Sequence, residues 1–173
     1  MSLFNKRTVT AVLLAATLAT GGCGFAPLYK QVDGETSVSE RFAEIEIPSI
    51  PDREGQILRN DLIDRLYTQG RPADARYTLK IDPVNTSISS LGIRKDATAT
   101  REQLTFSVHV QLVDRASSAV LLDRSVRAVG SYDILDSQYQ TLVSRQTASE
   151  RVLRELSDNI VTELSLYLQR TGS

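Results

Sequence analysis

The longest alternation of hydrophobic and polar residues in the chain lies in "EQLTFSVHVQLVD" (residues 102–114). One set of alternate positions is apolar and consists of Leu104, Phe106, Val108, Val110 and Leu112. The positions between them are polar and consist of Gln103, Thr105, Ser107, His109 and Gln111. A period of two over this length predicts a strand in an antiparallel sheet with one covered face.

Shorter stretches around this strand have similar patterns. "ARYTLKIDP" places Tyr77, Leu79 and Ile81 on one face of a predicted strand, which residues 85–93 prolong past Pro83. "AVLLDRSVRAVGSY" (residues 119–132) predicts a further strand after the turn "RASSA". "RFAEIEIP" predicts a short first strand that ends before the proline.

Two segments have helical rather than strand periodicity. Leu58, Leu62 and Leu66 are spaced four apart, which predicts a helix that begins near residues 51–52 and ends before Gly70. A second apolar stripe runs from Leu153 to Leu168. Thr147 and Glu150 have the spacing of a capping box, so this helix is predicted to begin there, after an irregular segment at 133–146.

The elements thus follow the order βαβββα, and each helix has one apolar side. We expect an α+β domain with a four-stranded, mostly antiparallel sheet and two helices on one of its faces. The other face is predicted to be solvated or covered by something else. This domain occupies residues 41–173, residues 23–40 form a tether, and residues 1–22 form a signal peptide.

The N-terminal segment contains the features of a bacterial export signal. A basic pair, Lys6 and Arg7, precedes a short apolar stretch that is too short to cross a bilayer, which requires about 20 residues. Small residues then lead to Cys23, the single cysteine of the chain, in a pattern similar to the lipobox of bacterial lipoproteins. The position three residues before Cys23 is Thr20 rather than the usual leucine. The alternative is an ordinary secretory signal with a chance cysteine at its edge.

Lipidation of Cys23 would account for an odd cysteine in an exported protein, because a lipidated sulfur cannot form a disulfide. Each buried methylene contributes about 0.8 kcal/mol, so several acyl chains would hold the protein firmly on a membrane. Gly24, rather than aspartate, follows Cys23, which by resemblance to other bacterial lipoproteins favours the periplasmic side of the outer membrane. The covalent lipid is the only non-protein group that we expect; no metal or other cofactor is predicted.

Charge and composition exclude several classes of protein. Without Lys6 and Arg7, 18 basic residues face 21 acidic ones, a net charge of about −3, whereas nucleic-acid binding favours a basic domain. His109 lies in the middle of a strand on its polar face, and no motif supplies the nucleophile and orienting acid that catalysis requires. We therefore expect a hydrogen-bonded or solvated histidine and a protein that is not an enzyme.

Two quoted segments resemble a known family. "CGFAPLY" is similar to the mature start of the alphaproteobacterial LptE proteins, which are lipopolysaccharide-assembly lipoproteins. "SYDILDSQYQTLVSRQTASERVLREL" resembles the end of their sheet and their last helix. The resemblance implies two helices on a four-stranded sheet, an LptD-type outer-membrane β-barrel that the protein plugs and helps to assemble, and contact with lipopolysaccharide.

Two other functions remain compatible with the sequence. One is an accessory or pilotin-like outer-membrane lipoprotein of another envelope assembly machine, and the other is a periplasmic enzyme on a lipid tether. The protein that co-purifies after detergent extraction distinguishes these alternatives.

A lipopolysaccharide site would require basic side chains, because lipid A carries phosphates or other acidic groups in many bacteria. Arginine can bind such a phosphate in bidentate fashion. Arg94, Lys95 and Arg101 lie in "GIRKDATATRE", the predicted connection between two strands, and Arg145 lies in the segment before the last predicted helix. We predict that these four residues contact lipopolysaccharide. The competing interpretation is a solvated hairpin tip, since exposed charges usually contribute little.

Overall fold

The structure is a computed structural model of the 173-residue chain that describes residues 38–68, 70–72, 74–93 and 99–171. The chain divides into two compact units, Met1–Asp33 and Gly34–Ser173, and the described residues all belong to the second. The predicted signal peptide, Cys23 and nearly all of the predicted tether lie outside the described residues.

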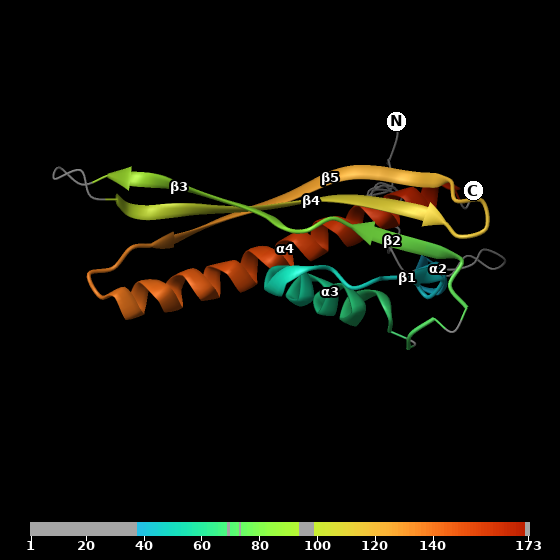
Figure 1. The fold of residues 1–173 in the computed structure, drawn as a ribbon, viewed down its shortest axis with the longest axis horizontal. Helices are drawn as coiled ribbons and strands as arrows, with labels where there is room; N and C mark the ends of the chain where they lie inside the picture. The colour runs from blue at the N-terminus through green and yellow to red at the C-terminus, as the bar shows by residue number, and fades with distance from the viewer. Residues whose placement is uncertain (1–37, 69, 73, 94–98, 172–173) are drawn as a thin grey trace, which may run out of the picture. The chain divides into compact units, whose positions relative to one another are not determined.

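The described chain forms three helices and five strands (Figure 1). In chain order they are α2 (Val38–Phe42), β1 (Ile45–Glu46), α3 (Asp52–Leu66), β2 (Tyr77–Ile81), β3 (Asn85–Ile93), β4 (Ala99–Asp114), β5 (Val120–Asp133) and α4 (Gln138–Thr171).

Strand β4 is the centre of the sheet. β5 pairs antiparallel with it along most of its length, from Arg101↔Asp133 to Val113↔Val120. β2 and β3 share the other side of β4: β2 pairs with residues 110–114 and β3 with residues 99–107, both antiparallel. The residues around Pro83 interrupt what is otherwise one long strand, because proline cannot donate a hydrogen bond to the ladder.

The prediction of an α+β fold is confirmed, but its four-stranded sheet requires correction. Within the described residues the sheet has five strands, because the break near Pro83 separates β2 from β3. The short strand β1 pairs with β2 in parallel, through Ile45↔Tyr77 and Glu46↔Thr78. A parallel pair follows from the connection, since α3 returns the chain to the end of the sheet at which β1 began.

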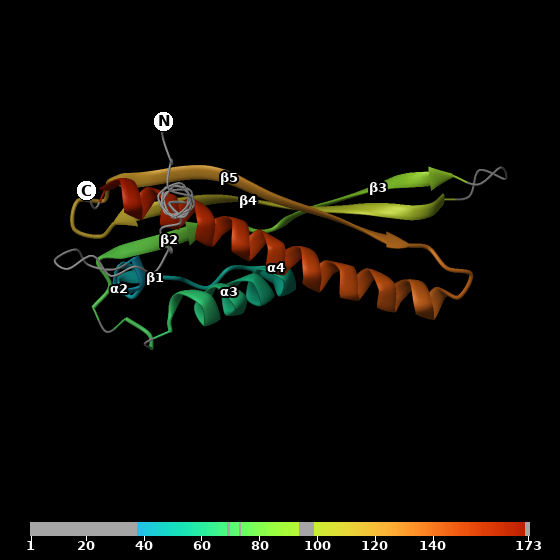
Figure 2. The same ribbon diagram turned by 180° about the vertical axis from the view of Figure 1, so that it is seen from behind.

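Helices α3 and α4 both lie on one face of the sheet, as expected (Figures 1 and 2). The apolar face of β4 from Leu104 to Leu112 is almost completely buried beneath them, while the polar face is partly exposed. The leucines that predicted the first helix, Leu58, Leu62 and Leu66, are at most 1% exposed. The periodicities of the sequence therefore identify the core correctly.

Two predicted boundaries are wrong. The segment before Ile45 is the short helix α2 rather than strand, and Arg41 in this helix donates a hydrogen bond to the carbonyl of Leu168 near the end of α4. Helix α4 begins at Gln138, so Thr147 and Glu150 lie inside the helix and form no capping box. The predicted irregular segment is in large part the first turns of α4.

Candidate functional site at the open end of the sheet

A groove lies where α3 begins, between the sheet and the first turns of α4. Helix α3 has 15 residues and α4 has 34, so the start of α4 extends beyond α3 and faces the strands without a second helix beside it (Figures 1 and 2). The groove has a volume of about 230 Å³ and is lined by residues of α3, β3, β4 and α4. Its position is set by the different lengths of the two helices.

The groove has an apolar floor and a charged rim. Leu104, Phe106 and Leu153 form the floor and are themselves at most 1% exposed. The charged side chains of the lining are Arg53, Glu54, Arg145 and Glu150. Two arginines and two glutamates balance in formal charge, so the groove resembles an amphiphile-binding surface more than a simple anion site.

Arg145 also lies near a buried hydrogen bond at the end of the sheet. Tyr132 is 5% exposed, and its hydroxyl donates to Oε2 of Glu102 on the neighbouring strand. Burial, together with this hydrogen bond to Glu102, raises the pKa of Tyr132 to about 12, and the charge of Arg145 partly opposes the shift. Glu102 has the same strand parity as the buried Leu104, so this pair lies on the helix side of the sheet.

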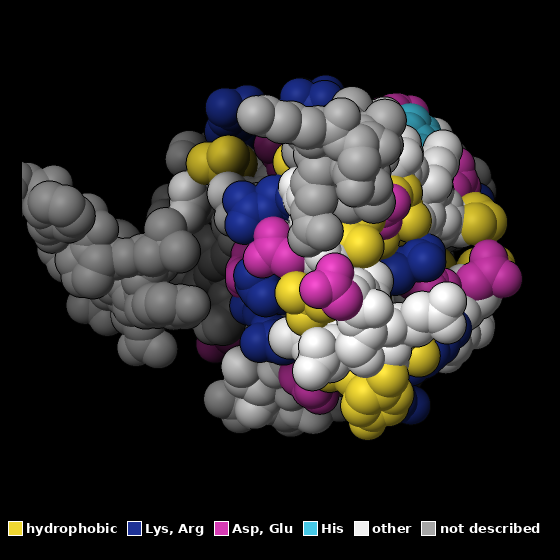
Figure 3. Space-filling model, turned by 90° about the vertical axis from the view of Figure 1, so that its left-hand side faces the viewer, with side chains coloured by type: hydrophobic (Ala, Val, Ile, Leu, Met, Phe, Trp, Pro, Cys, Tyr) yellow, Lys and Arg dark blue, Asp and Glu magenta, His cyan; other side chains and the backbone are white. Residues whose placement is uncertain are grey.

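An apolar stripe continues from the groove along α4. Tyr139, Leu142 and Val143 are 75%, 62% and 46% exposed, and their spacing places them on one side of the helix. Leu142 belongs to both the stripe and the groove. Figure 3 shows this end of the domain, where hydrophobic side chains alternate with basic and acidic ones and a large hydrophobic patch lies on its lower side. Exposed apolar residues that adjoin one another indicate an interaction surface.

The two predicted basic residues that the structure describes, Arg101 and Arg145, lie on opposite faces of the sheet. Arg101 lies on the outer face of the sheet, where its Nε donates to Oδ1 of Asp133 at 2.8 Å, and this interaction lowers the pKa of Asp133. Arg145 lies on the opposite, helix-covered side, in the groove. Arg94 and Lys95 lie outside the described residues, as does Cys23.

The predicted surface histidine lies beside an acidic side chain. Nε2 of His109 is 3.3 Å from Oδ1 of Asp123, whose other oxygen accepts a hydrogen bond from Gln111 at 2.8 Å. Both side chains of the His109–Asp123 pair are well exposed on the polar face of the sheet. The arrangement is that of a cross-strand polar network.

Sequence reasoning missed the other residues of the groove. Arg53 and Glu54 belong to the first turn of α3, and Glu150 is one turn beyond Arg145 on α4. Residues 53 and 145 are far apart in the chain, and only the packing of α3 on α4 brings them to one groove. The exposed apolar spacing of Tyr139, Leu142 and Val143 was a usable signal, because it is helical in a segment predicted to be irregular.

The described residues contain neither a candidate metal site nor a candidate membrane-spanning helix. No group of three or more His, Cys, Asp or Glu side chains in the part of the chain that the structure describes is placed to hold a metal ion. Among the same residues, no helix combines the length and the apolar character that a membrane crossing demands.

The fold is similar to several solved lipoprotein structures. A lipoprotein structure from Caulobacter crescentus is 26% identical, covers 80% of this chain and 99% of its own, and has a TM-score of 0.61. A minor lipoprotein from Acinetobacter baumannii is 18% identical, with coverage of 72% and 92% and a TM-score of 0.58. The rare lipoprotein B from Shewanella oneidensis is 10% identical, with coverage of 75% and 98% and a TM-score of 0.59. The last two likenesses concern the fold alone.

The comparison with families gives a more specific result. No curated protein sequence matches the chain. The model of the LptE family, described as lipopolysaccharide-assembly, matches residues 42–164, which include α3, all of β2–β5 and most of α4. This match covers well over half of the chain and includes every described residue of the groove. The chain therefore belongs to the LptE family of lipopolysaccharide-assembly proteins.

Proposed function

We propose that this protein is a lipid-anchored component of the outer-membrane machinery that delivers lipopolysaccharide to the cell surface. In this proposal Cys23 carries the lipid, the domain plugs and helps to assemble an LptD-type β-barrel, and the groove contacts lipopolysaccharide. The family match over residues 42–164 is the observation that carries the proposal. The protein acts by binding and assembly, not by catalysis.

The chemistry of the groove supports contact with lipopolysaccharide. Lipid A combines acyl chains with phosphates or other acidic groups, so its binding surface requires apolar area beside arginine donors. The floor residues Leu104 and Phe106 and the adjoining stripe supply the apolar area, and Arg53 and Arg145 supply the donors. Of the four basic residues proposed for this contact, Arg145 has the strongest support, because it lies where both kinds of surface meet.

The polar outer face of the sheet supports a position inside a water-filled barrel. Thr105, Ser107 and Gln111 on this face are polar and partly exposed. Inside a barrel, such a face can be hydrated by water in the lumen or can form hydrogen bonds with polar residues of the barrel wall. Detergent extraction of a tagged full-length chain should recover a large outer-membrane β-barrel in equal amount. Recovery of a different envelope machine would favour the accessory-lipoprotein alternative.

The lipopolysaccharide site is tested by two sets of substitutions in the full chain, purified in detergent. The groove set replaces Arg53 and Arg145 by Ser, and the hairpin set replaces Arg94, Lys95 and Arg101 by Ser. We expect the groove set to weaken lipopolysaccharide binding about tenfold, a loss of about 1.4 kcal/mol, and to leave barrel recovery and thermal stability unchanged. The hairpin set is the control and removes one positive charge more than the groove set, so general charge attraction would make its loss the larger one. A loss confined to the hairpin set would move the site to the hairpin tip.

A further inference from the structure

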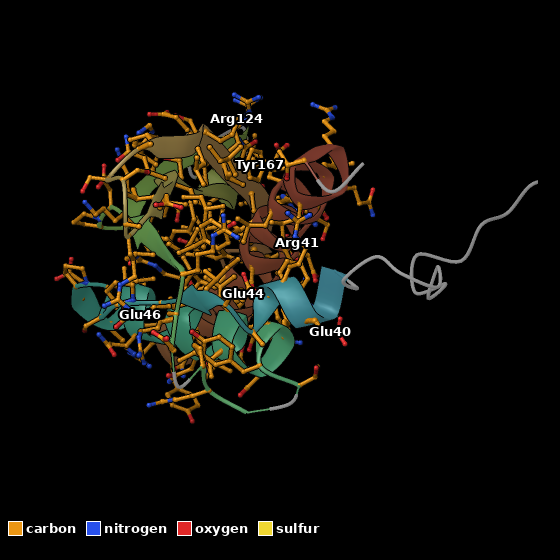
Figure 4. All side chains as sticks on the ribbon, turned by 90° about the vertical axis from the view of Figure 1, so that its right-hand side faces the viewer. Glu40, Arg41, Glu44, Glu46, Arg124 and Tyr167 are labelled. Carbon is orange, nitrogen blue, oxygen red and sulfur yellow. The ribbon has the colours of Figure 1, made fainter. Side chains whose placement is uncertain are left out.

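A second cavity lies at the other end of α3, away from the groove. Its volume is about 240 Å³, and strand β1, the chain that follows α3, and the β4–β5 turn surround it. Its lining includes three arginines, Arg59, Arg71 and Arg115, but only one acidic residue, Glu46. Figure 4 views the end of the domain at which α2 and β1 lie, and there Glu46 and Arg41 occupy different sides. Arg41 donates a hydrogen bond to the carbonyl of Leu168 near the end of α4 and does not line the cavity.

Backbone hydrogen bonds hold two of the arginines in place. Nε of Arg59 donates to the carbonyls of Ile47 at 3.2 Å and Pro48 at 2.9 Å. Arg115 donates from Nη1 to the carbonyl of Ala75 at 3.1 Å. Side chains that are fixed in this way lose little further conformational entropy when a ligand binds. Among the described residues, no other hydrogen bond uses the terminal nitrogens of Arg59, which leaves them available to an anion.

Tyr67 completes the wall between these arginines. Its hydroxyl donates to the carbonyl of Ile45 at 2.8 Å and accepts from the amide of Ile47 at 3.2 Å. Burial raises the pKa of the Tyr67 hydroxyl, while the charges of Arg59 and Arg71 act in the opposite direction. Arg59 and Arg71 both line this cavity together with Tyr67.

The charges of the cavity do not balance. Glu46 forms an ion pair with Arg115 at 3.4 Å, which neutralises that arginine. Within the part of the chain that the structure describes, no carboxylate forms an ion pair with Arg59 or Arg71. A cavity with two such arginines has a local excess of positive charge on a domain whose total charge is negative. Arginine pairs of this kind favour phosphate, whose oxygens accept from the planar guanidinium in bidentate fashion.

We infer that this cavity binds the phosphate of an anionic membrane phospholipid. The choice of a lipid over a free phosphate depends on the proposed lipid anchor. Cys23 precedes Val38 by 15 positions, which an extended chain spans in at most about 50 Å. Glu46 and Ile47 of the cavity follow closely after Val38, so this cavity lies nearer in the chain than the groove to the residues that carry the proposed anchor. Such a contact would orient the domain on the membrane before any barrel is present.

Calorimetric titration of the detergent-purified full chain with soluble short-chain lipids tests this inference. We expect dihexanoyl phosphatidylglycerol to bind and dihexanoyl phosphatidylcholine to bind more weakly. Inorganic phosphate should compete with phosphatidylglycerol. The substitution Arg59→Gln with Arg71→Gln should weaken phosphatidylglycerol binding about tenfold. Arg71→Gln alone should weaken it about threefold without affecting the fold, because Arg71 is exposed and makes no hydrogen bond in the described structure.

Arg154→Gln is the matched control for Arg71→Gln, since Arg154 is an exposed arginine on α4 outside the cavity. An equal loss in this control would show general charge attraction and overturn the site. If the cavity binds inorganic phosphate but not phosphatidylglycerol, its ligand is a free phosphate and not a phospholipid. Unchanged phosphatidylglycerol binding in the double variant would show that Arg59 and Arg71 do not form the lipid site. Lipopolysaccharide and barrel are both absent from this titration, so its failure would leave the proposed function intact.

Discussion

At the scale of single residues, Gly130 allows the longest helix to pack against the sheet. A Cβ atom at this position would lie 2.4 Å from Cγ2 of Val152, which is far inside contact distance. Val152 is 2% exposed and short, so it cannot move aside. Glycine is required here because of this close approach of β5 and α4.

The substitution Gly130→Ala should therefore destabilise the domain by about 1–3 kcal/mol, as overpacking does in other cores. Urea unfolding followed by circular dichroism measures the loss. Val152→Ala should be destabilising alone, yet recover part of the stability when combined with Gly130→Ala. Independent, additive effects of the two substitutions would contradict the proposed contact.

Tyr132 predicts a pH dependence at the same end of the sheet. Its pKa is raised to about 12, so the stabilisation it provides is complete below the unfolded value of 10 and is lost as the pH rises from 10 to 12. Tyr132→Phe removes the hydrogen bond to Glu102, and we expect it to cost about 1 kcal/mol below pH 10 and to make the alkaline decline in stability shallower. Urea unfolding across this range measures both effects. Tyr139→Phe, at an exposed position, is the control, and parallel curves for wild type and Tyr132→Phe would contradict the assignment.

At the scale of elements, the start of α4 shows why helix boundaries are difficult to predict. Thr147 and Glu150 have the spacing of a capping box, but they lie inside the helix, which begins at Gln138. A second pair with the same spacing, Ser137 and Gln140, marks the actual start: the amide of Gln140 donates to Oγ of Ser137 at 3.5 Å. The sequence contains both signals, and tertiary packing selects between them.

Thr141 strengthens this start of the helix. Its hydroxyl accepts from the amide of Leu135 at 2.9 Å and is 3.1 Å from the carbonyl of the same residue. Replacing Ser137 and Thr141 together by Ala should fray the first turns of α4 and accelerate amide hydrogen exchange from residue 138 to residue 146. Exchange in the core part of the helix near Leu156 should not change. Faster exchange along the whole helix would mean that these residues stabilise more than its first turns.

The strands were predicted more completely than the helix boundaries. Alternation along β4 and β2 is a local property, so it identifies both the strands and their buried faces from sequence. Strand pairing is not a local property. The parallel contact of β1 with β2 depends on the path of α3 between them. The separation of β2 from β3, which the sequence predicts as one continuous strand, depends on the break near Pro83. The candidate site has the same limitation, since Arg145 was predicted but its partner Arg53 is brought to it only by packing.

At the scale of the whole molecule, we expect lipidation to determine where the domain acts. We predict that the chain is cleaved before Cys23 and that the cysteine is acylated. Cys23→Ser should leave an unprocessed or soluble chain, which fractionation and mass spectrometry of the intact protein would detect. An unmodified wild-type chain in the soluble periplasm would contradict the anchor, and with it the source of phosphate that we assign to the second cavity.

The short length of α3 has a consequence for cooperativity. One end of the sheet is enclosed by two helices, whereas at the other end β3, β4 and β5 have only α4 beside them (Figure 1). Local unfolding free energies follow buried apolar contacts, so we expect the open end to unfold locally at a lower free energy than the enclosed end. A ligand that binds only the folded form of this end would stabilise it by mass action. We therefore expect occupancy of the groove to increase the order of the strands around it, while the enclosed end remains folded with or without ligand.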